Sequence, residues 1–257
     1  MHCDHRLVRH TPAAHGMNGM AGVHGALTGA VHAVRDVLFS RGCAGCGAPD
    51  EVLCGTCMRG LVQPVCFDLP ATVCGIGMAC GSYHGPLRRA VLAWKDHGDA
   101  ECDGPFSDAM VALLQAEPLR STLDQVGAVA VVPAPSSWRS ICTRGRSQLD
   151  PIAGALAERL CAWGVKARVQ RALEIRHIRT KSVQTASARG RRERVTGHIR
   201  CRNGVRLPAG MPVIVIDDIV TSGATMRECI DVLRAQGNPV LAALALAHTP
   251  PRAPERS

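Results

Sequence analysis

The sequence predicts an α/β fold in which a central parallel sheet is flanked by helices. Two continuous apolar runs, VGAVAVVPAPS at residues 126–136 and PVIVI at residues 212–216, are typical of buried parallel strands. Amphipathic segments follow both runs, and a last apolar run, PVLAALALA at residues 239–247, closes the pattern. Strands that alternate with helices in this way form right-handed parallel units.

Helical periodicity is clear upstream of the first of these strands. Residues 83–98 (YHGPLRRAVLAWKDHG) place Leu87, Val91 and Trp94 on one face of a helix. Lys95 lies beside that apolar face. Two more helices are expected, at residues 31–39 and at residues 106–115 with Ser107 as the N-cap.

Both strands have a helix downstream. In LDPIAGALAERLCAWG, at residues 149–164, Asp150 can cap the helix, Pro151 suits its first position and Gly164 suits the position after its end. Residues 225–236 predict the second helix, which Gly237 ends. The expected core-facing residues are Ile152, Leu156 and Leu160 in the former helix, and Met226, Ile230 and Leu233 in the latter.

Composition indicates a packed globular protein, because 46% of the 257 residues are apolar. Neither a run of about 18 apolar residues nor a secretory signal is evident, so we expect a cytoplasmic protein without a membrane span. The net charge of +9 is concentrated at residues 166–206, where 13 Lys or Arg face two Glu. This segment points to an anionic partner. Within it, we expect a weak strand at residues 166–173 and a long mobile loop or ribbon at residues 176–199.

Four of the 13 cysteines form two CxxC pairs in CAGCGAPDEVLCGTC. Two such knuckles can close a tetrahedron of thiolates around a structural zinc ion, with all four positions filled by protein. An iron–sulfur cluster and a redox dithiol are the alternatives. The expected ligands are Cys43, Cys46, Cys54 and Cys57, whereas Cys66, Cys74 and Cys80 lack paired spacing and have no assigned role.

The segment VIVIDDIVTSGAT, at residues 213–225, places two acids at the end of a strand and small hydroxyl residues at the start of a helix. Ligands of open parallel sheets bind at the carboxyl ends of strands. Successive amides at a helix N-terminus bind phosphate, and Gly223 permits a close approach. Because carboxylates repel phosphate, Asp217 and Asp218 must face sugar hydroxyls or a ligand-bound cation. A phosphorylated ribose satisfies both demands.

This segment resembles the phosphoribosyl diphosphate (PRPP) binding signature of type I phosphoribosyltransferases. The resemblance implies the type I phosphoribosyltransferase fold, with Asp217 and Asp218 on the ribose 2′ and 3′ hydroxyls and Mg²⁺ on the diphosphate. Catalysis would rest on electrostatic stabilisation of the leaving group and of an oxocarbenium-like sugar. The residues implied at the 5′-phosphate are Thr221, Ser222, Gly223, Ala224 and Thr225.

A wider resemblance, over residues 31–248, is to the ComF family of competence-associated proteins. It rests on the four-cysteine module, YHGPLRRAVLAWKDHG, VVPAPSSWRSICTRGRSQ and the PRPP signature. The resemblance implies a diphosphate site at Pro133, Ala134 and Pro135, with Arg139 and Arg144 nearby, and a donor-site role for Lys95. The sequence departs from the family pattern in VQTASARGRRERVTGHI, where Ser187 stands in place of a common Leu and Arg194 lies near an expected Asn.

The expected organisation is a disordered extension at residues 1–30, a helix and zinc-ribbon-like module at 31–80, a phosphoribosyltransferase-like domain at 81–250 and a tail at 251–257. Three functions follow. The first is transfer of ribose 5-phosphate from PRPP to an unidentified nitrogenous acceptor. The second is a single-stranded DNA-binding or DNA-uptake accessory role, and the third is non-catalytic PRPP sensing. The sequence does not specify the acceptor or the oligomeric state.

Overall fold

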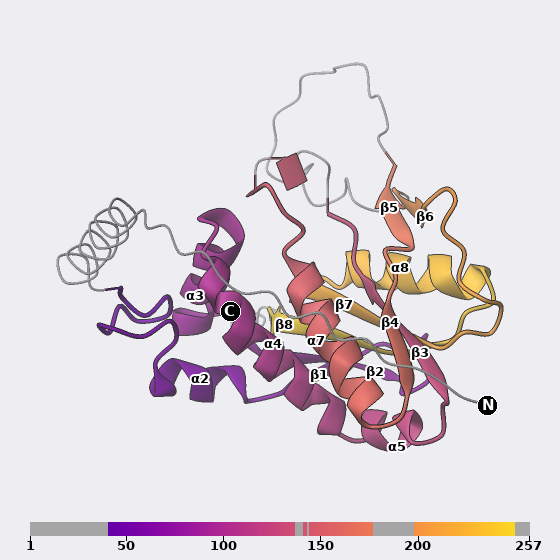
Figure 1. Cartoon of the computed structure of the whole chain (residues 1–257), viewed down its shortest axis with the longest axis horizontal. Coiled ribbons are helices and arrows are strands. Elements are labelled where there is room, and N and C mark those ends of the chain that lie inside the picture. The colour runs from indigo at the N-terminus through magenta and orange to yellow at the C-terminus, as the bar shows by residue number, and fades with distance from the viewer. Residues whose placement is uncertain (1–40, 137–140, 143, 177–197, 250–257) are drawn as a thin grey trace, which may run out of the picture. The chain divides into compact units, whose positions relative to one another are not determined.

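The computed structural model describes residues 41–136, 141–142, 144–176 and 198–249. A six-stranded sheet forms its centre, with the strand order β1-β2-β8-β7-β3-β4 (Figure 1). The strands are β1 (Val65–Asp68), β2 (Ile76–Ser82), β3 (Ala128–Pro133), β4 (Lys166–Val169), β7 (Val213–Val220) and β8 (Val240–His248). Only β1 runs antiparallel to its neighbour, β2, and the other pairs of this sheet are parallel. The predicted parallel sheet is confirmed, with an antiparallel edge strand added.

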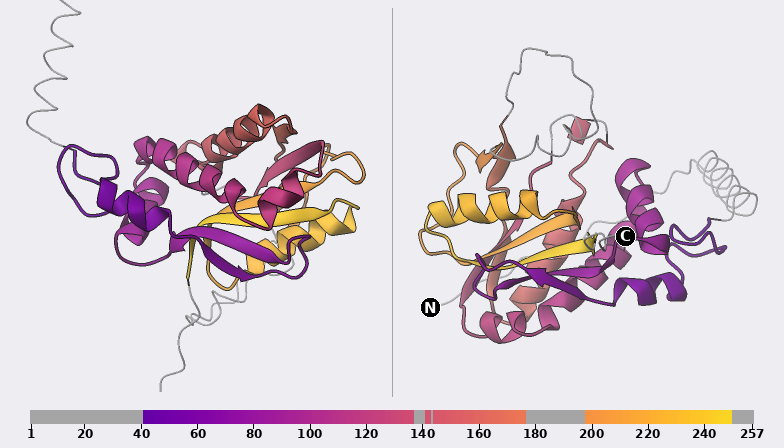
Figure 2. Two further views of the ribbon diagram at one scale, coloured as in Figure 1. Left: turned by 90° about the horizontal axis from the view of Figure 1, so that it is seen from below. Right: turned by 180° about the vertical axis from the view of Figure 1, so that it is seen from behind.

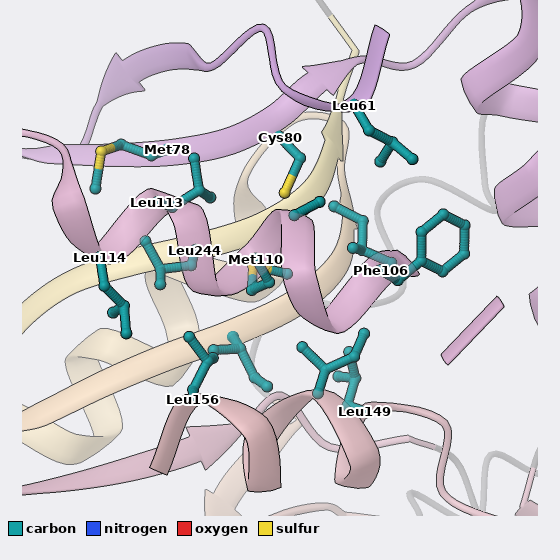
Figure 3. Packing of buried hydrophobic residues seen from close by; sticks show 14 of the residues in the cluster. Leu61, Met78, Cys80, Phe106, Met110, Leu113, Leu114, Leu149, Leu156 and Leu244 are labelled. Atoms are coloured by element: carbon teal, nitrogen blue, oxygen red, sulfur yellow. The ribbon is translucent and has the colours of Figure 1, made fainter. Parts of the chain in front are cut away.

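Helices cover both faces of this sheet (Figure 2). One apolar cluster joins the sheet to α2 (Gly55–Leu61), α3 (Gly85–Asp96), α4 (Asp103–Ala112), α5 (Leu119–Leu123) and α7 (Leu149–Ala162). On the other face, α8 (Ala224–Ala235) packs against a second cluster. Figure 3 shows Met110 of α4 between Cys80 of β2 and Leu149 of α7. Two short 3₁₀ turns, Ala100–Cys102 and Leu113–Gln115, flank α4.

The predicted start of the helix at residue 106 is wrong, and so is the capping role of Ser107. The chain already turns through Ala100–Cys102, and α4 begins at Asp103. Ser107 therefore lies inside the helix, where its side chain is buried. Asp103 has another use, because its carboxylate accepts hydrogen bonds from the Trp94 indole and from Arg146.

The predicted cap of α7 is also displaced. The helix begins at Leu149, so Asp150 lies in its first turn and forms an ion pair with Arg171 instead of capping the helix. Its C-terminal end agrees with the prediction, since Gly164 takes a positive φ of 85° just beyond the last turn. The expected stripe of Ile152, Leu156 and Leu160 is buried, as are Met226, Ile230 and Leu233 of α8.

The strand expected at residues 212–216 is longer than predicted. β7 continues to Val220, because β8 pairs with it as far as His248. The two aspartates thus lie within the paired part of β7, near its carboxyl end, and not beyond the strand. The weak strand expected at 166–173 divides into β4 and β5 (Leu173–Ile175), which pairs with β6 (Ile199–Cys201) in a separate two-stranded sheet.

From Gly42 onward the described residues form one compact unit. The predicted boundary between residues 31–80 and 81–250 falls within β2, which is a strand of the central sheet. The N-terminal extension 1–30, the helix at 31–39, most of the loop at 176–199 and the tail at 251–257 lie outside the described residues. Within the described part, the helices are too short or too polar to cross a membrane.

Candidate functional site

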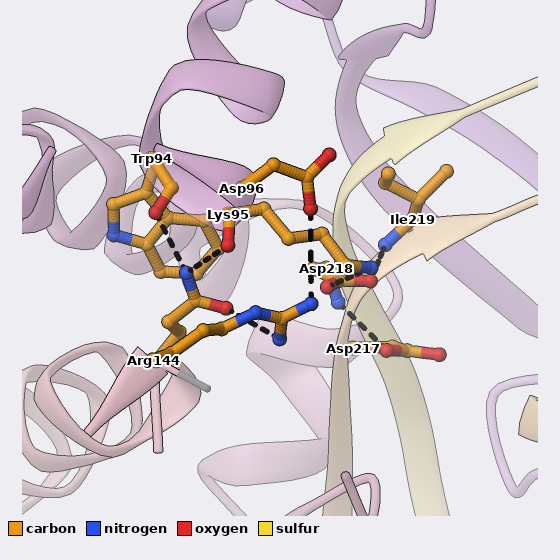
Figure 4. A network of polar contacts seen from close by, with 8 residues as sticks. Trp94, Lys95, Asp96, Arg144, Asp217, Asp218 and Ile219 are labelled. Atoms are coloured by element: carbon orange, nitrogen blue, oxygen red, sulfur yellow. Dashed lines mark hydrogen bonds and ion pairs between the residues drawn. The ribbon is translucent and has the colours of Figure 1, made fainter. Parts of the chain in front are cut away.

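Two adjacent carboxylates stand near the carboxyl end of β7. Asp217 is opposite Ala245 of β8 in the sheet register. Its Oδ1 accepts the amide hydrogen of Asp218 at 2.8 Å, and Oδ1 of Asp218 accepts that of Ile219 at 2.7 Å. Each side chain is thus tied to the next backbone amide, which leaves its second oxygen for another partner (Figure 4).

For Asp218 that partner is Lys95, whose ammonium group forms an ion pair with Oδ2. The two side chains are 26% and 16% exposed, so water screens the pair only in part. Leu87, Val91 and Trp94 are buried on one side of α3, as the sequence predicts. This burial fixes the rotation of the helix and brings Lys95 to the strand.

Among the residues that the structure describes, no cation forms an ion pair with Asp217. Burial disfavours its charged form, and the neighbouring carboxylate of Asp218 adds repulsion. Together they raise the pKa of Asp217 to about 8, although the amide of Asp218 and the charge of Lys95 oppose the shift. The pair therefore holds one carboxylate that is neutralised by a cation and one carboxyl group that retains a proton near neutral pH.

A helix N-terminus follows directly after the aspartates. Gly223, with φ of 72°, is the residue before α8, and the amide of Ala224 donates to the Ser222 hydroxyl at 3.4 Å. The first amides of a helix have no partner within it. Thr221 and Ser222 are exposed, and Thr225 lies in the first turn with Gly223 and Ala224 half-buried beside it. The predicted loop residues are therefore together at one accessible helix end.

The loop after β3 is adjacent to this unit. Pro133 ends the strand, and the amide of Ala134 donates to the carbonyl of Ile216 at 2.7 Å, so Ala134 and Pro135 are next to the strand that carries the aspartates. Arg144 lies elsewhere along the same connection. Its guanidinium reaches Gln148 at 2.9 Å and Asp96 at 3.8 Å, beside Lys95. Arg139 lies outside the described residues.

A cavity of about 1030 Å³ adjoins the loop after β3, and its lining residues do not include the aspartate pair. Residues 133–136 form one wall. Its charged lining residues are Arg146, Arg171, Arg176, Arg200 and Arg202 with Asp150 and Glu174. Most of these arginines already have a carboxylate partner. Arg171 pairs with Asp150, Arg146 with Asp103, and both Arg200 and Arg202 with Glu174. The cavity is therefore basic overall, but much of its charge is compensated.

The four predicted cysteine ligands come together in the structure. Their sulfur atoms all lie within 4.8 Å of one another, and the sulfurs of Cys46 and Cys54 are 3.5 Å apart. Four sulfurs around zinc at about 2.3 Å would be separated by about 3.8 Å, so the cluster fits a tetrahedral ion after a small contraction. The four-cysteine cluster can thus hold a metal ion.

Glycine makes this close approach feasible. A Cβ atom on Gly45 would lie 2.6 Å from the sulfur of Cys57. The cluster also touches the helix that carries Lys95, because Arg89 of α3 donates to the carbonyl of Gly45 at 2.5 Å. Burial opposes ionisation of Cys43, but amides of Cys54 and Cys46 lower the pKa of its thiol to about 6. One ligand is therefore prepared to bind as thiolate.

Sequence reasoning missed one residue of the aspartate site. Gln148 is buried, and its side chain bonds to the carbonyls of Trp94 and Lys95 and to the guanidinium of Arg144. These partners, apart from Arg144, lie 54 and 53 positions away, so no local pattern reveals the contact.

Comparisons with known proteins agree with this geometry. Residues 151–256 match the family model of the phosphoribosyl transferase domain. An orotate phosphoribosyltransferase of Caulobacter vibrioides (strain NA1000 / CB15N) is 34% identical over 71 residues, which are 28% of this chain and 33% of that protein. That of Parvibaculum lavamentivorans is 43% identical over 54 residues, which are 21% of this chain and 28% of that protein. The chain thus spans about a third of the length of the curated relatives it matches.

Among solved structures, orotate phosphoribosyltransferase from Aeropyrum pernix has a TM-score of 0.33 and 23% sequence identity, and the match covers 74% of this chain and 77% of that chain. The matched domain of 151–256 contains β7, the aspartate pair and α8. The central sheet around it is mostly parallel and has helices on both faces. The chain therefore has the type I phosphoribosyltransferase fold, preceded by a four-cysteine cluster that can hold a metal ion.

Proposed function

We propose that this protein binds PRPP and transfers its ribose 5-phosphate to a nitrogenous acceptor. The observation that carries the proposal is the continuous unit of β7 and α8, in which Asp217 and Asp218 directly precede the helix N-terminus at Gly223. The acids are suited to the ribose hydroxyls, and the amides and hydroxyls of residues 221–225 to the 5′-phosphate. In this pose the β3 loop at Pro133–Pro135 lies toward the diphosphate.

The chemistry asked of this site is electrostatic. The bond between C1 of the ribose and the diphosphate oxygen breaks, the sugar gains oxocarbenium character, and the acceptor nitrogen forms the new bond. The side chains of Asp217 and Asp218 hold the hydroxyls, and the carboxylate of Asp218 offsets positive charge on the ring. Bound Mg²⁺ would neutralise charge on the departing diphosphate. Lys95 provides a cation at the same edge of the sheet, in ion pair with Asp218.

Calorimetric titration with PRPP and Mg²⁺ tests the donor site. We expect wild type to bind, and the double substitution of Asp217→Asn with Asp218→Asn to weaken binding at least about tenfold, or about 1.4 kcal/mol. Asp231→Asn, at an exposed position of α8, is the control and should bind as wild type does. A folded wild-type protein with no affinity for PRPP would refute the proposal. Release of diphosphate in the presence of nucleobases or amines then tests turnover and identifies the acceptor.

A PRPP-sensing role is the first alternative, in which PRPP binds without release of diphosphate. A second is the binding of single-stranded DNA, which the basic segment at 166–206 and the arginines of the cavity support. DNA affinity that survives the aspartate substitutions and falls when Arg189, Arg191 and Arg192 become Ala would favour it. Those three arginines lie outside the described residues.

For the cysteine cluster we propose a structural zinc ion, because four thiolates leave no coordination position for a substrate. We also propose membership of the ComF family. The proposal is supported by the contact between the cluster and α3, which joins the cysteine module to the helix that bears Lys95. The link to DNA uptake that this family implies is a proposal of the same kind.

A further inference from the structure

Gln148 is one of a small set of buried polar residues in the described structure, with an exposed fraction of 5%. Its amide is fully used. Nε2 donates to the carbonyl of Trp94 at 2.6 Å and to that of Lys95 at 2.9 Å, while Oε1 accepts from Arg144 at 2.9 Å. A buried amide is costly unless its donors and acceptor are all satisfied, so its position is strongly specified.

The two carbonyls belong to the last turn of α3, which ends at Asp96. Carbonyls at a helix C-terminus have no partner within the helix. Gln148 supplies that partner from the start of α7, so it caps α3 from a distant part of the chain. The capped carbonyls are those of Lys95 itself and of the residue before it, and the carboxylate of the residue after it, Asp96, faces Arg144 at 3.8 Å.

The segment that precedes α7, residues 144–148, contacts α3 at a second point. Arg146 forms a two-pronged contact with Asp103, and the carboxylate of Asp103 also accepts from the Trp94 indole at 2.6 Å. The Trp94 ring is buried and meets Phe106 edge to face at 5.3 Å. Arg144, Arg146 and Gln148 therefore hold the backbone and side chains on both sides of Lys95.

We propose that Gln148 is a positioning residue, which fixes the end of α3 so that Lys95 is held against Asp218 at the donor site. This inference rests on the proposed function, since it assigns Gln148 a part in PRPP binding. The hydrogen bonds of Gln148 within the described residues are to Trp94, Lys95 and Arg144, so it acts on Asp218 through Lys95.

The structure offers a matched control in Asn238. This amide is 2% exposed, and its Nδ2 donates to two backbone carbonyls, those of Pro208 and Met211, at 2.8 and 3.3 Å. Asn238 lies before β8, at the opposite end of that strand from His248. Asn238→Leu thus removes the same kind of buried amide as Gln148→Met while leaving α3 untouched.

The first measurement does not depend on PRPP. The chain has three lysines, and the amine of Lys95 can be compared with that of exposed Lys166 by competitive acetylation and mass spectrometry of the full chain. An ion-paired ammonium is acylated slowly. Gln148→Met should raise the Lys95-to-Lys166 acetylation ratio about threefold, the range expected for loss of one partly exposed ion pair. Gln148→Glu, which keeps the acceptor for Arg144 but places an oxygen against both carbonyls, should do the same.

The second measurement is PRPP affinity with Mg²⁺. Gln148→Met should weaken binding about fivefold, Asn238→Leu should not, and the double variant of Gln148→Met with Lys95→Met should bind no worse than Lys95→Met alone. An unchanged acetylation ratio in both Gln148 variants, an equal change in Asn238→Leu, or additive losses of affinity would overturn the inference. If wild type binds no PRPP, the proposed function fails, and the acetylation ratio still decides whether Gln148 positions Lys95.

Discussion

The ammonium group of Lys95, on α3, is in ion pair with Asp218, the second of two adjacent acids on β7. A helix that precedes the matched phosphoribosyl transferase domain thus contributes a cation to the acids of that domain. The ion pair with Lys95 makes the two acids electrostatically different. Asp218 is compensated by Lys95, whereas Asp217 is desolvated and has a pKa of about 8.

This raised pKa predicts how stability depends on pH. Between the ordinary carboxyl value of 3.8 and the folded value of about 8, the folded protein binds more protons than the unfolded chain. The contribution of Asp217 to the free energy of unfolding is therefore greatest at low pH and falls as pH rises through this window. Asp217→Asn keeps an acceptor for the amide of Asp218 and removes the titration. At pH 8 the free energy of unfolding of this variant, measured by chemical denaturation, should exceed that of wild type by at least about 1 kcal/mol.

Asp231→Asn, at an exposed acid of α8, is the control and should follow the wild-type pH profile. If the difference between Asp217→Asn and wild type is the same at pH 5 and pH 8, the raised pKa of Asp217 is not the cause. The comparison uses the folded protein without PRPP, so it is independent of the proposed activity.

Local information explains which parts of the site the sequence predicts. The unit of β7 and α8 is formed by one contiguous stretch of the sequence. Its signals follow each other directly: an apolar run, two acids, a glycine and an amphipathic helix. Gly223 and Gly237, at the two ends of α8, both take positive φ values. The spacing of the four cysteines likewise predicts a metal site, and their sulfur atoms lie close together in the structure.

Contacts between distant segments could not be predicted. The bond from Gln148 to Lys95 joins two helices, and neither residue carries a local signal for it. The β1–β2 hairpin is hard to predict because β1 has only 4 residues and β2 carries two glycines, Gly77 and Gly81. The reason for one of them, Gly77, is tertiary, since a Cβ there would lie 2.4 Å from the ring of Phe67. The two misplaced caps, Ser107 and Asp150, show the same limit, because packing moved the helix starts by a few residues.

The cysteine cluster predicts a metal requirement. The purified chain should contain about one zinc ion, and Cys57→Ser should lose it and unfold at a temperature several degrees lower, because metal binding is coupled to folding. Cys66→Ser is the control, since Cys66 is exposed on β1 and outside the cluster. Elemental analysis and thermal unfolding are the measurements. A folded wild-type protein without metal, or equal loss from both variants, contradicts the prediction.

Gly45 tests the fit of this cluster more finely. Its absent side chain leaves room for the sulfur of Cys57, and a methyl group would also crowd Pro86 at 3.3 Å. Gly45→Ala should therefore lower metal affinity and stability by about 2 kcal/mol or more. Gly55→Ala, at the first residue of α2, meets nothing closer than 3.8 Å and should be neutral or stabilising by up to about 1 kcal/mol. The measurement is the amount of metal that each variant retains in the presence of a chelator. Equal retention by Gly45→Ala and Gly55→Ala would show that the cluster does not need a glycine at position 45.

The two glycines at the ends of α8 separate stability from ligand binding. Gly223 and Gly237 have φ values of 72° and 80°, so an alanine at either position should cost about 1 kcal/mol of folding free energy. Only Gly223 lies at the proposed 5′-phosphate site, where a Cβ would also approach Arg227 at 3.2 Å. Gly223→Ala should weaken PRPP binding at least about tenfold in calorimetry, while Gly237→Ala binds as wild type does. Equal affinities in the two variants would place the phosphate away from this helix end, because a change in amide geometry at the N-terminus of α8 cannot leave a phosphate bound there unaffected.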